Sequence, residues 1–131
     1  MVDQTQVMAM LVAACPSFRR TWEQYVGSEE YDDELLYVHL GECARHLVTL
    51  YGAGDTSEFA AVFRVVEDLH VRGDSHVRQA ATVGLLETLQ NIAEHRDLDP
   101  AVFVQFLGPE SARWWDKLDR FWSGDSSALR E

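Results

Sequence analysis

The feature that most constrains the fold of this sequence is the spacing of apolar residues across positions 55–96. Over residues 56–71 and again over 75–95, apolar side chains recur at steps of three and four, which is the period of a helix that buries one face. Between the two runs, we expect Gly73 to end the first helix in a left-handed conformation and Asp74 to cap the second. The stretch therefore predicts an αα-hairpin, and each of its helices needs a further layer to cover its other flank.

The same helical period occurs on both sides of this hairpin. We expect further helices over residues 3–14, 18–26, 33–51, 100–107 and 110–122. Start signals support several of them: Asp55 and Glu58 fit a capping box, and Asp99 precedes a proline. No strand pattern is present, so the sequence predicts an all-α fold of six or seven helices, stacked as αα-hairpins in one compact domain. We expect this domain to span residues 1–124, with 125–131 as a flexible tail.

One segment of the hairpin resembles a known repeat. Residues 73–81, Gly-Asp-Ser-His-Val-Arg-Gln-Ala-Ala, are similar to the second helix of a HEAT-type repeat. There an Asp caps the turn, a Val packs in the core, an Arg lies along the layer and two Ala let helices approach. Those roles match Asp74, Val77, Arg78, Ala80 and Ala81. The resemblance implies stacked helical hairpins with a concave face that binds partners.

The charge balance bears on partners. The 131 residues include 22 acidic and 11 basic side chains, for a net charge of −11. This balance repels phosphate backbones, so we expect no nucleic-acid partner, and it favours either a basic protein partner or simple solubility. The chain is also similar in style to short acidic helical proteins of bacteria, some of which are immunity proteins of toxin systems.

The cysteines and the apolar runs bear on the compartment. Cys15 and Cys43 both lie on apolar helical stripes, so we expect buried thiols rather than a bridge or a nucleophile. The apolar run over residues 7–15 is too short to cross a membrane, and no basic residues flank it to hold it on a membrane surface. We therefore expect a cytoplasmic protein with no membrane partner.

A run of acids after the second predicted helix is the first candidate site. Residues 28–34 hold five acids and no base, so we expect an exposed loop that leads into the next helix. One interpretation is simple solvation. The other is a docking patch for a cationic protein, anchored by an exposed aromatic ring. The candidate partner-binding residues are Glu29, Glu30, Tyr31, Asp32, Asp33, Glu34 and Trp115. Of the adjacent tryptophans Trp114 and Trp115, one should lie in the core and one nearer the surface.

A second candidate is a metal site on the helix predicted over 33–51. His39, Glu42 and His46 lie at i, i+3 and i+7, and histidine with carboxylate can hold zinc or iron. The competing interpretation is polar side chains that border a helix seam. Because the spaced signatures of zinc sites are absent, we expect no cofactor.

The function that these features favour is a non-enzymatic protein-binding module. Its concrete version is an immunity protein or antitoxin that binds a basic toxin through an acidic surface. The alternatives are a small metal-binding protein that uses the three residues above, and a homodimeric structural or adaptor protein. The sequence leaves enzymatic activity open, but we recognise no catalytic motif in it. The one glycine-rich stretch, Gly52-Ala53-Gly54, is not a nucleotide-binding loop, because no strand precedes it.

Overall fold

The computed structural model describes residues 1–125 and 127–129, and within them the protein is all-α, as predicted. The α-helices are α1 (Gln4–Ala14), α2 (Arg19–Val26), α3 (Leu36–Gly52), α4 (Phe59–Arg72), α5 (Ser75–Gln79), α6 (Thr88–His95) and α7 (Pro109–Trp122). Three further helical segments are η1 (Pro16–Phe18), η2 (Ala80–Glu87) and η3 (Pro100–Phe106), of which η1 and η3 are 3₁₀-helices and η2 is a π-helix.

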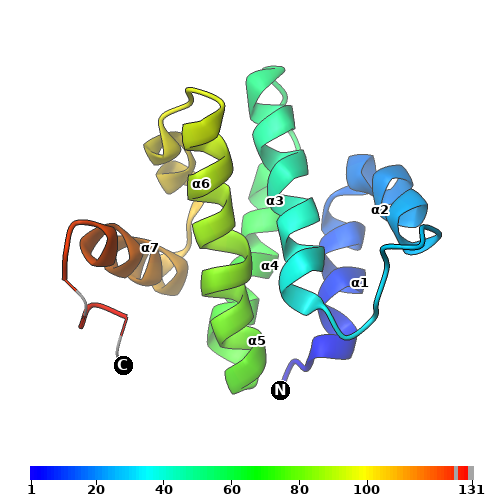
Figure 1. Ribbon diagram of the computed structural model, residues 1–131, viewed down its shortest axis with the longest axis horizontal. Helices are drawn as coiled ribbons and strands as arrows, with labels where there is room; N and C mark the ends of the chain where they lie inside the picture. Colours follow the sequence, from blue (N-terminus) through cyan, green and yellow to red (C-terminus); the bar gives the residue numbers. More distant parts are fainter. Residues whose placement is uncertain (126, 130–131) are drawn as a thin grey trace.

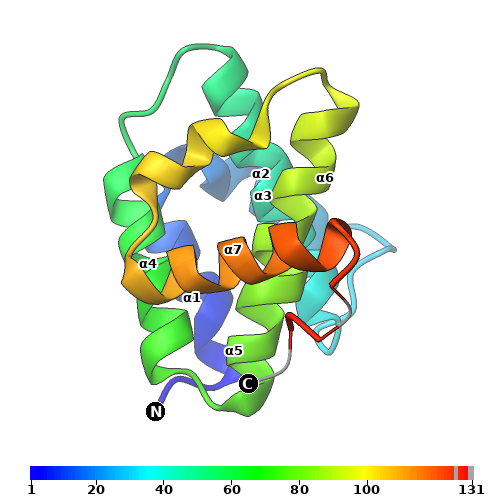
Figure 2. The ribbon, with the colours of Figure 1, turned by 90° about the vertical axis from the view of Figure 1, so that its left-hand side faces the viewer.

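The helices pack around one continuous helix, residues 75–95, formed by α5, η2 and α6 and here called the central helix. Figure 1 shows it beside α3, with α4 behind them, α1 and α2 on one flank, and α7 on the other. Figure 2 shows η3 and α7 running across α4 and the central helix. The turn of the expected hairpin is present, but the central helix makes its most extensive contact with α3 rather than with α4.

Aromatic side chains form the centre of the core on the flank covered by η3. Phe59, Phe63 and Phe103 are fully buried. The Phe59 ring meets the edge of Phe106 at 5.0 Å between centroids and the ring of Phe63 at 5.7 Å. The short helix η3 therefore closes the core over α4 with two phenylalanines, each of which contributes a large apolar area.

The central helix contains a wide stretch that the sequence does not reveal. Over η2 the backbone follows the i→i+5 pattern of a π-helix, which is rare outside single turns. Gly84 lies inside this stretch, where an added Cβ would be 3.2 Å from Leu40 Cδ1 and 3.3 Å from Tyr37 Cα. Glycine at this position therefore allows a close approach of the central helix to α3.

The turn before the central helix differs from the expectation. Gly73 has φ −70° and ψ 152°, so it is extended and not left-handed. It is needed for space, because an added Cβ would overlap the carbonyl oxygen of Leu69 and lie 2.6 Å from Val77 Cγ1. The cap is as predicted, since Asp74 accepts a hydrogen bond from the Val77 amide at 2.9 Å. The Asp74 amide in turn donates to the carbonyl of Val2 at 2.9 Å, which fixes the first residues of the chain here.

The predicted capping box at the start of α4 is wrong. Asp55 accepts from the amide and hydroxyl of Ser57, at 3.1 and 2.7 Å. Glu58 does not reach back to Asp55, and its carboxylate instead accepts from the amide of Ser17 at 3.1 Å and from the Ser17 hydroxyl. The helix consequently begins at Phe59, three residues later than expected.

The described part of the C-terminal segment packs on the domain. Asp125 accepts hydrogen bonds from the amide and hydroxyl of Ser127, Ala128 is 7% exposed, and Leu129 packs against the core. These contacts differ from the expected flexible tail. The rest of that expectation falls on residues 126, 130 and 131, which lie outside the described residues.

Both cysteines are free and buried, as expected. Burial raises the pKa of Cys15 to about 11 and raises the pKa of Cys43 further, so neither thiol ionises near neutral pH. In the described part of the chain, no helix combines the length and apolar character needed to span a bilayer.

Candidate functional site

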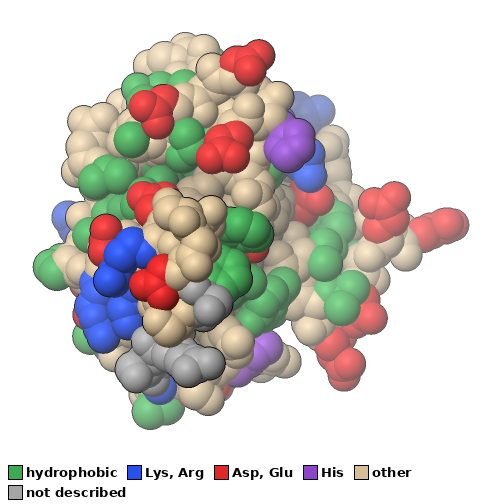
Figure 3. All heavy atoms as spheres, turned by 60° about the vertical axis from the view of Figure 1, so that its left-hand side comes forward, with side chains coloured by type: hydrophobic (Ala, Val, Ile, Leu, Met, Phe, Trp, Pro, Cys, Tyr) green, Lys and Arg blue, Asp and Glu red, His purple; other side chains and the backbone are tan. Residues whose placement is uncertain are grey.

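The acidic run forms an exposed loop between α2 and α3, as predicted. Its five carboxylate residues are all exposed, whereas Tyr31 between them is half-buried. Figure 3 shows acidic side chains projecting at one edge of the molecule, away from a face where Lys and Arg gather. In this region the loop presents negative charge without an intervening base, so it produces a concentrated negative field.

A cluster of aromatic rings holds this loop against the helices, and we call it the aromatic platform: Trp22, Tyr25, Tyr31 and His39. The Tyr31 ring stacks on His39 with centroids 5.1 Å apart and planes at 6°, and the Trp22 ring meets His39 edge-on at 5.2 Å. His39 is buried and donates from Nε2 to the backbone carbonyl of Asp32 at 2.9 Å. The platform therefore fixes the loop to α2 and α3, so that its acids project from an ordered base.

A groove of about 820 Å³ opens beside the loop, between α1, α2 and the acidic residues. Apolar side chains line part of it: Met8, Val12, Trp22 and Val26. Acidic side chains line another part: Glu23, Asp33 and Glu34. Among the described residues that line it, Arg19 is the one lysine or arginine. This combination can receive a chain segment that carries both apolar and cationic side chains.

The structure does not bring the three candidate metal ligands together as one group. His39 is engaged by the aromatic platform, and Nε2 of His46 is hydrogen-bonded to Ser17 Oγ at 2.8 Å. Among the residues that the structure describes, no group of three or more His, Cys, Asp or Glu side chains is placed to hold a metal ion. The i, i+3, i+7 spacing puts His39, Glu42 and His46 along one helix. The two histidines are nevertheless hydrogen-bonded to different segments, His39 to the acidic loop and His46 to η1.

The expectation that Trp115 is an exposed anchor is wrong. Trp115 is 4% exposed and packs in the core, as do Ser111 and Leu118 on the same face of α7. Trp114 is half-buried, and Trp122 is the exposed tryptophan of this helix, at 60%. Ser111, on the same buried face of α7 as Trp115, is bonded to Glu67 of α4.

The bond between α7 and α4 is a carboxylate cap that sequence reasoning missed. Glu67 of α4 accepts from the amides of Glu110 and Ser111, at 3.0 and 2.9 Å, and from the Ser111 hydroxyl at 2.9 Å. Burial raises the pKa of Glu67, but these hydrogen bonds outweigh it and the net pKa is lowered. Gly108 leaves room for this carboxylate, since an added Cβ would be 2.6 Å from Glu67 Cδ.

His70 lies one turn further along α4 and is 4% exposed. Its Nδ1 donates to the Val66 carbonyl at 2.9 Å and lies 3.2 Å from Ser111 Oγ, while Nε2 is 3.0 Å from Thr82 Oγ1. Burial lowers the pKa of His70 despite the Val66 carbonyl and two nearby glutamates, which act in the opposite direction. The imidazole is therefore neutral near neutral pH and joins α4, α7 and the central helix.

This lowered pKa predicts a loss of stability at acid pH. Because the unfolded chain binds a proton on His70 near pH 6.5 and the folded chain only at lower pH, the contribution is fully present above that pH and decreases as the pH falls below it. We expect urea unfolding to show a smaller loss of stability between about pH 7.5 and 5.5 in His70→Gln than in the wild type. His95→Gln, at an exposed position, should retain the wild-type loss. Equal losses in all three proteins would refute the assignment.

Comparison of the sequence with known protein families gives one match. The model of a family described as Domain of unknown function (DUF7674) matches residues 8–123, which include the acidic loop, the aromatic platform and the α4–α7 cap. Neither the curated proteins nor the solved structures contain a match to the chain. The family model covers all of the α-helices except the first residues of α1, and the chain therefore belongs to the DUF7674 family.

Proposed function

We propose that this protein is a non-enzymatic binding protein whose acidic loop and adjoining groove receive a basic, amphipathic segment of a partner protein. The observation that carries the proposal is the position of the groove. Met8, Val12 and Val26 supply its apolar lining, and Asp33 and Glu34 line the same groove. Apolar contacts supply affinity at the centre of such an interface, and charges at its edge supply steering and specificity.

The order of the loop supports this role. A loop that holds five acids repels itself, yet the aromatic platform and the bond from His39 to the Asp32 carbonyl fix its backbone. A preorganised charged surface loses less conformational entropy on binding than a disordered one. Val26 is 39% exposed at the groove, so it offers an apolar contact beside the acids.

The concrete form of the proposal is an immunity protein or antitoxin that acts in the cytoplasm on a basic toxin. A toxin that cleaves nucleic acid needs a cationic active site to attract phosphate, and an acidic surface can dock there. The net charge of −11 and the two free thiols, which suit a reducing compartment, support this form. The resemblance of residues 73–81 to a HEAT-type helix supports partner binding in the same way.

Neutralising the groove acids tests the proposal. In Glu23→Gln/Asp33→Asn/Glu34→Gln, we expect the affinity for the partner to fall by roughly tenfold or more at low salt, because exposed interfacial charges act through long-range attraction. The difference should shrink at about 1 M salt, where the Debye length is only about 3 Å. The three side chains make no hydrogen bond or ion pair within the described residues, so the variant should fold normally.

A matched control has the same change in charge elsewhere: Asp68→Asn/Glu94→Gln/Asp97→Asn. Wild type, variant and control are each used as bait on native cell extract at low salt. The partner is the basic protein that wild type and control retain and the variant loses, and its affinity is then measured by calorimetry. If the variant retains the same proteins as the control, or a captured protein binds both with equal affinity, the groove is not the binding site. A doubled mass by light scattering would favour the homodimeric alternative.

A further inference from the structure

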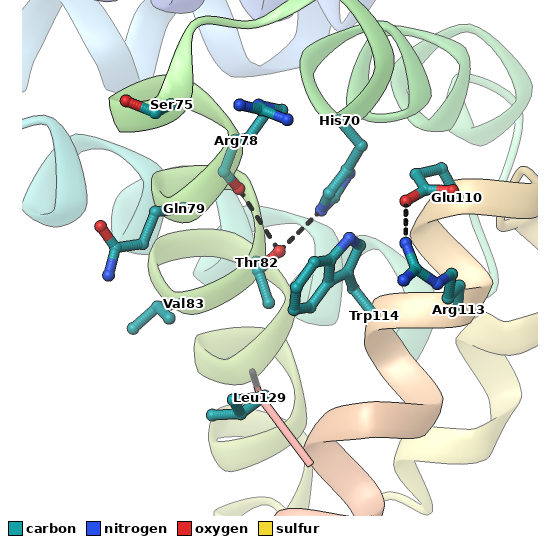
Figure 4. Close-up of a pocket in the computed structure, with 10 residues that line it drawn as sticks. All are labelled: His70, Ser75, Arg78, Gln79, Thr82, Val83, Glu110, Arg113, Trp114 and Leu129. Carbon is teal, nitrogen blue, oxygen red and sulfur yellow. Dashed lines mark hydrogen bonds and ion pairs between the residues drawn. The ribbon is translucent and has the colours of Figure 1, made fainter. Parts of the chain in front are cut away.

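A second cavity lies on the opposite flank of the central helix from the acidic groove. It has a volume of about 560 Å³ and lies between the central helix, the end of α4 and the start of α7 (Figure 4). Cavities of roughly 300–1,000 Å³ are the usual size for small-molecule sites. The proposed function does not use this cavity. No described residue lines both this cavity and the acidic groove.

The charge of this cavity differs from that of the molecule. The chain has twice as many acids as bases, yet among the described residues two arginines and one acid line the cavity. The acid, Glu110, is already paired with Arg113 at 2.7 Å. Arg78 is different, because within the described residues its guanidinium has no hydrogen bond or ion pair. The cavity therefore carries a positive charge that no described side chain neutralises.

Polar groups accompany that charge at one end of the cavity. In Figure 4, Ser75 and Gln79 lie to one side of Arg78 on the same helix, with their polar ends turned away from its guanidinium, and the hydroxyl of Thr82 lies below it. The Thr82 hydroxyl lies 3.0 Å from His70 Nε2 and 3.3 Å from the Arg78 carbonyl, so its one proton already has an acceptor. The guanidinium of Arg78 therefore remains as the donor for a ligand at this end. A free guanidinium suits an oxyanion, which it binds through two parallel hydrogen bonds.

The other end of the cavity is apolar. Val83 and Leu129 line it, and the indole of Trp114 stands between them and the polar end (Figure 4). Lys117 Nζ lies 4.4 Å from the centroid of the Trp114 ring and the Arg113 guanidinium carbon 5.5 Å from it. These cation–π contacts hold the indole in place as a fixed wall against which a flat group can pack.

We propose that this cavity binds a small organic oxyanion, a carboxylate or phosphate head on a flat apolar body. The head lies at the Arg78 guanidinium, and the body extends along Trp114 toward Val83 and Leu129. The carboxylate and the phosphate share the same recognition by a guanidinium, so the probes below separate them.

Titrations followed by ¹⁵N–¹H NMR test this proposal with four probes: indole-3-acetate, adenosine monophosphate, inorganic phosphate and neutral indole. We expect saturable shifts of the Trp114 indole N–H and of the Arg78 and Thr82 amides with indole-3-acetate or with adenosine monophosphate. Saturation with the first alone assigns a carboxylate, and with the second alone a phosphate. Neutral indole and inorganic phosphate should each bind more weakly, because each supplies only one half of the ligand.

Arg78→Gln should weaken binding of the preferred probe by roughly tenfold or more, because a charge-assisted pair is lost. The matched control is Arg64→Gln, an exposed arginine on α4 that loses the same charge and should bind as the wild type does. Both side chains lack hydrogen bonds within the described residues, so both variants should retain the wild-type spectrum. The absence of saturable shifts with every probe, or equal weakening in the two variants, would overturn the proposal.

Discussion

Replacing Gly73 with alanine is expected to destabilise the fold by roughly 2–4 kcal/mol, an overpacking effect at the upper end of the usual range. The backbone conformation at Gly73 is one that alanine adopts freely, so the loss arises from space alone. The added methyl group would overlap the Leu69 carbonyl oxygen and press on Val77, and relief requires the turn to move. That turn also bonds to Val2, so its movement breaks the attachment of the first residues.

The matched control is Gly52→Ala, at the end of α3. An added Cβ there meets nothing within 4 Å, so we expect a change between neutral and a stabilisation of about 1 kcal/mol, because alanine favours a helix. Urea unfolding monitored by circular dichroism measures both variants. Similar stabilities for the two variants would show that the close contact at Gly73 does not limit the turn.

Replacing Glu67 with alanine should cost about 3 kcal/mol, because the carboxylate accepts three hydrogen bonds at the start of α7. Its removal leaves the amides of Glu110 and Ser111 without their partner and removes a negative charge from a helix N-terminus. We expect the loss to be measured as a lower midpoint of urea unfolding. Asp68→Ala is the control, since the neighbouring Asp68 makes no hydrogen bond within the described residues and should change stability by less than about 0.5 kcal/mol.

A double-mutant cycle identifies the cap as the cause. Gly108→Ala alone should be destabilising, because the added Cβ would lie 2.6 Å from the Glu67 carboxyl carbon. In the Glu67→Ala background that contact no longer exists, so the same substitution should cost less. Additive effects of the two substitutions would mean that Gly108 and Glu67 do not act together.

The elements that could be predicted from the sequence are those set by nearby residues. Asp74 and Asp99 cap helices through amides two or three positions away, and the pattern of apolar residues gives the helical period directly. Glu58 could not be assigned in this way, because its partner Ser17 lies 41 positions earlier. The same four residues, 55–58, are compatible with a capping box and with a bond from Ser17 to Glu58. Only the tertiary packing determines which of the two forms.

The candidate sites show the same division. The acidic loop was predicted to be exposed because five like charges cannot be buried together, and it is exposed. The groove beside the loop depends on how α1 packs against α2, and the local sequence pattern does not predict that packing. The burial of Trp115 is not readable locally, since its face of α7 also carries Ser111, whose partner Glu67 lies 44 positions earlier. The oxyanion cavity likewise joins Arg78 to Trp114 across the fold.

The π-helical stretch Ala80–Glu87 has a consequence for insertions and deletions within the family. An i→i+5 turn holds one residue more than an i→i+4 turn, so the stretch has a residue that a regular α-helix would not need. A relative that lacks one residue here can tighten to an α-helix and keep both ends of the central helix on their neighbours. A deletion in the regular helix α3 cannot be absorbed in this way. It would rotate the residues that follow it by about 100°, so that Leu40 and Leu47 could no longer face the core together. We therefore expect single-residue length differences among DUF7674 sequences to occur at the stretch 80–87 and not within α3.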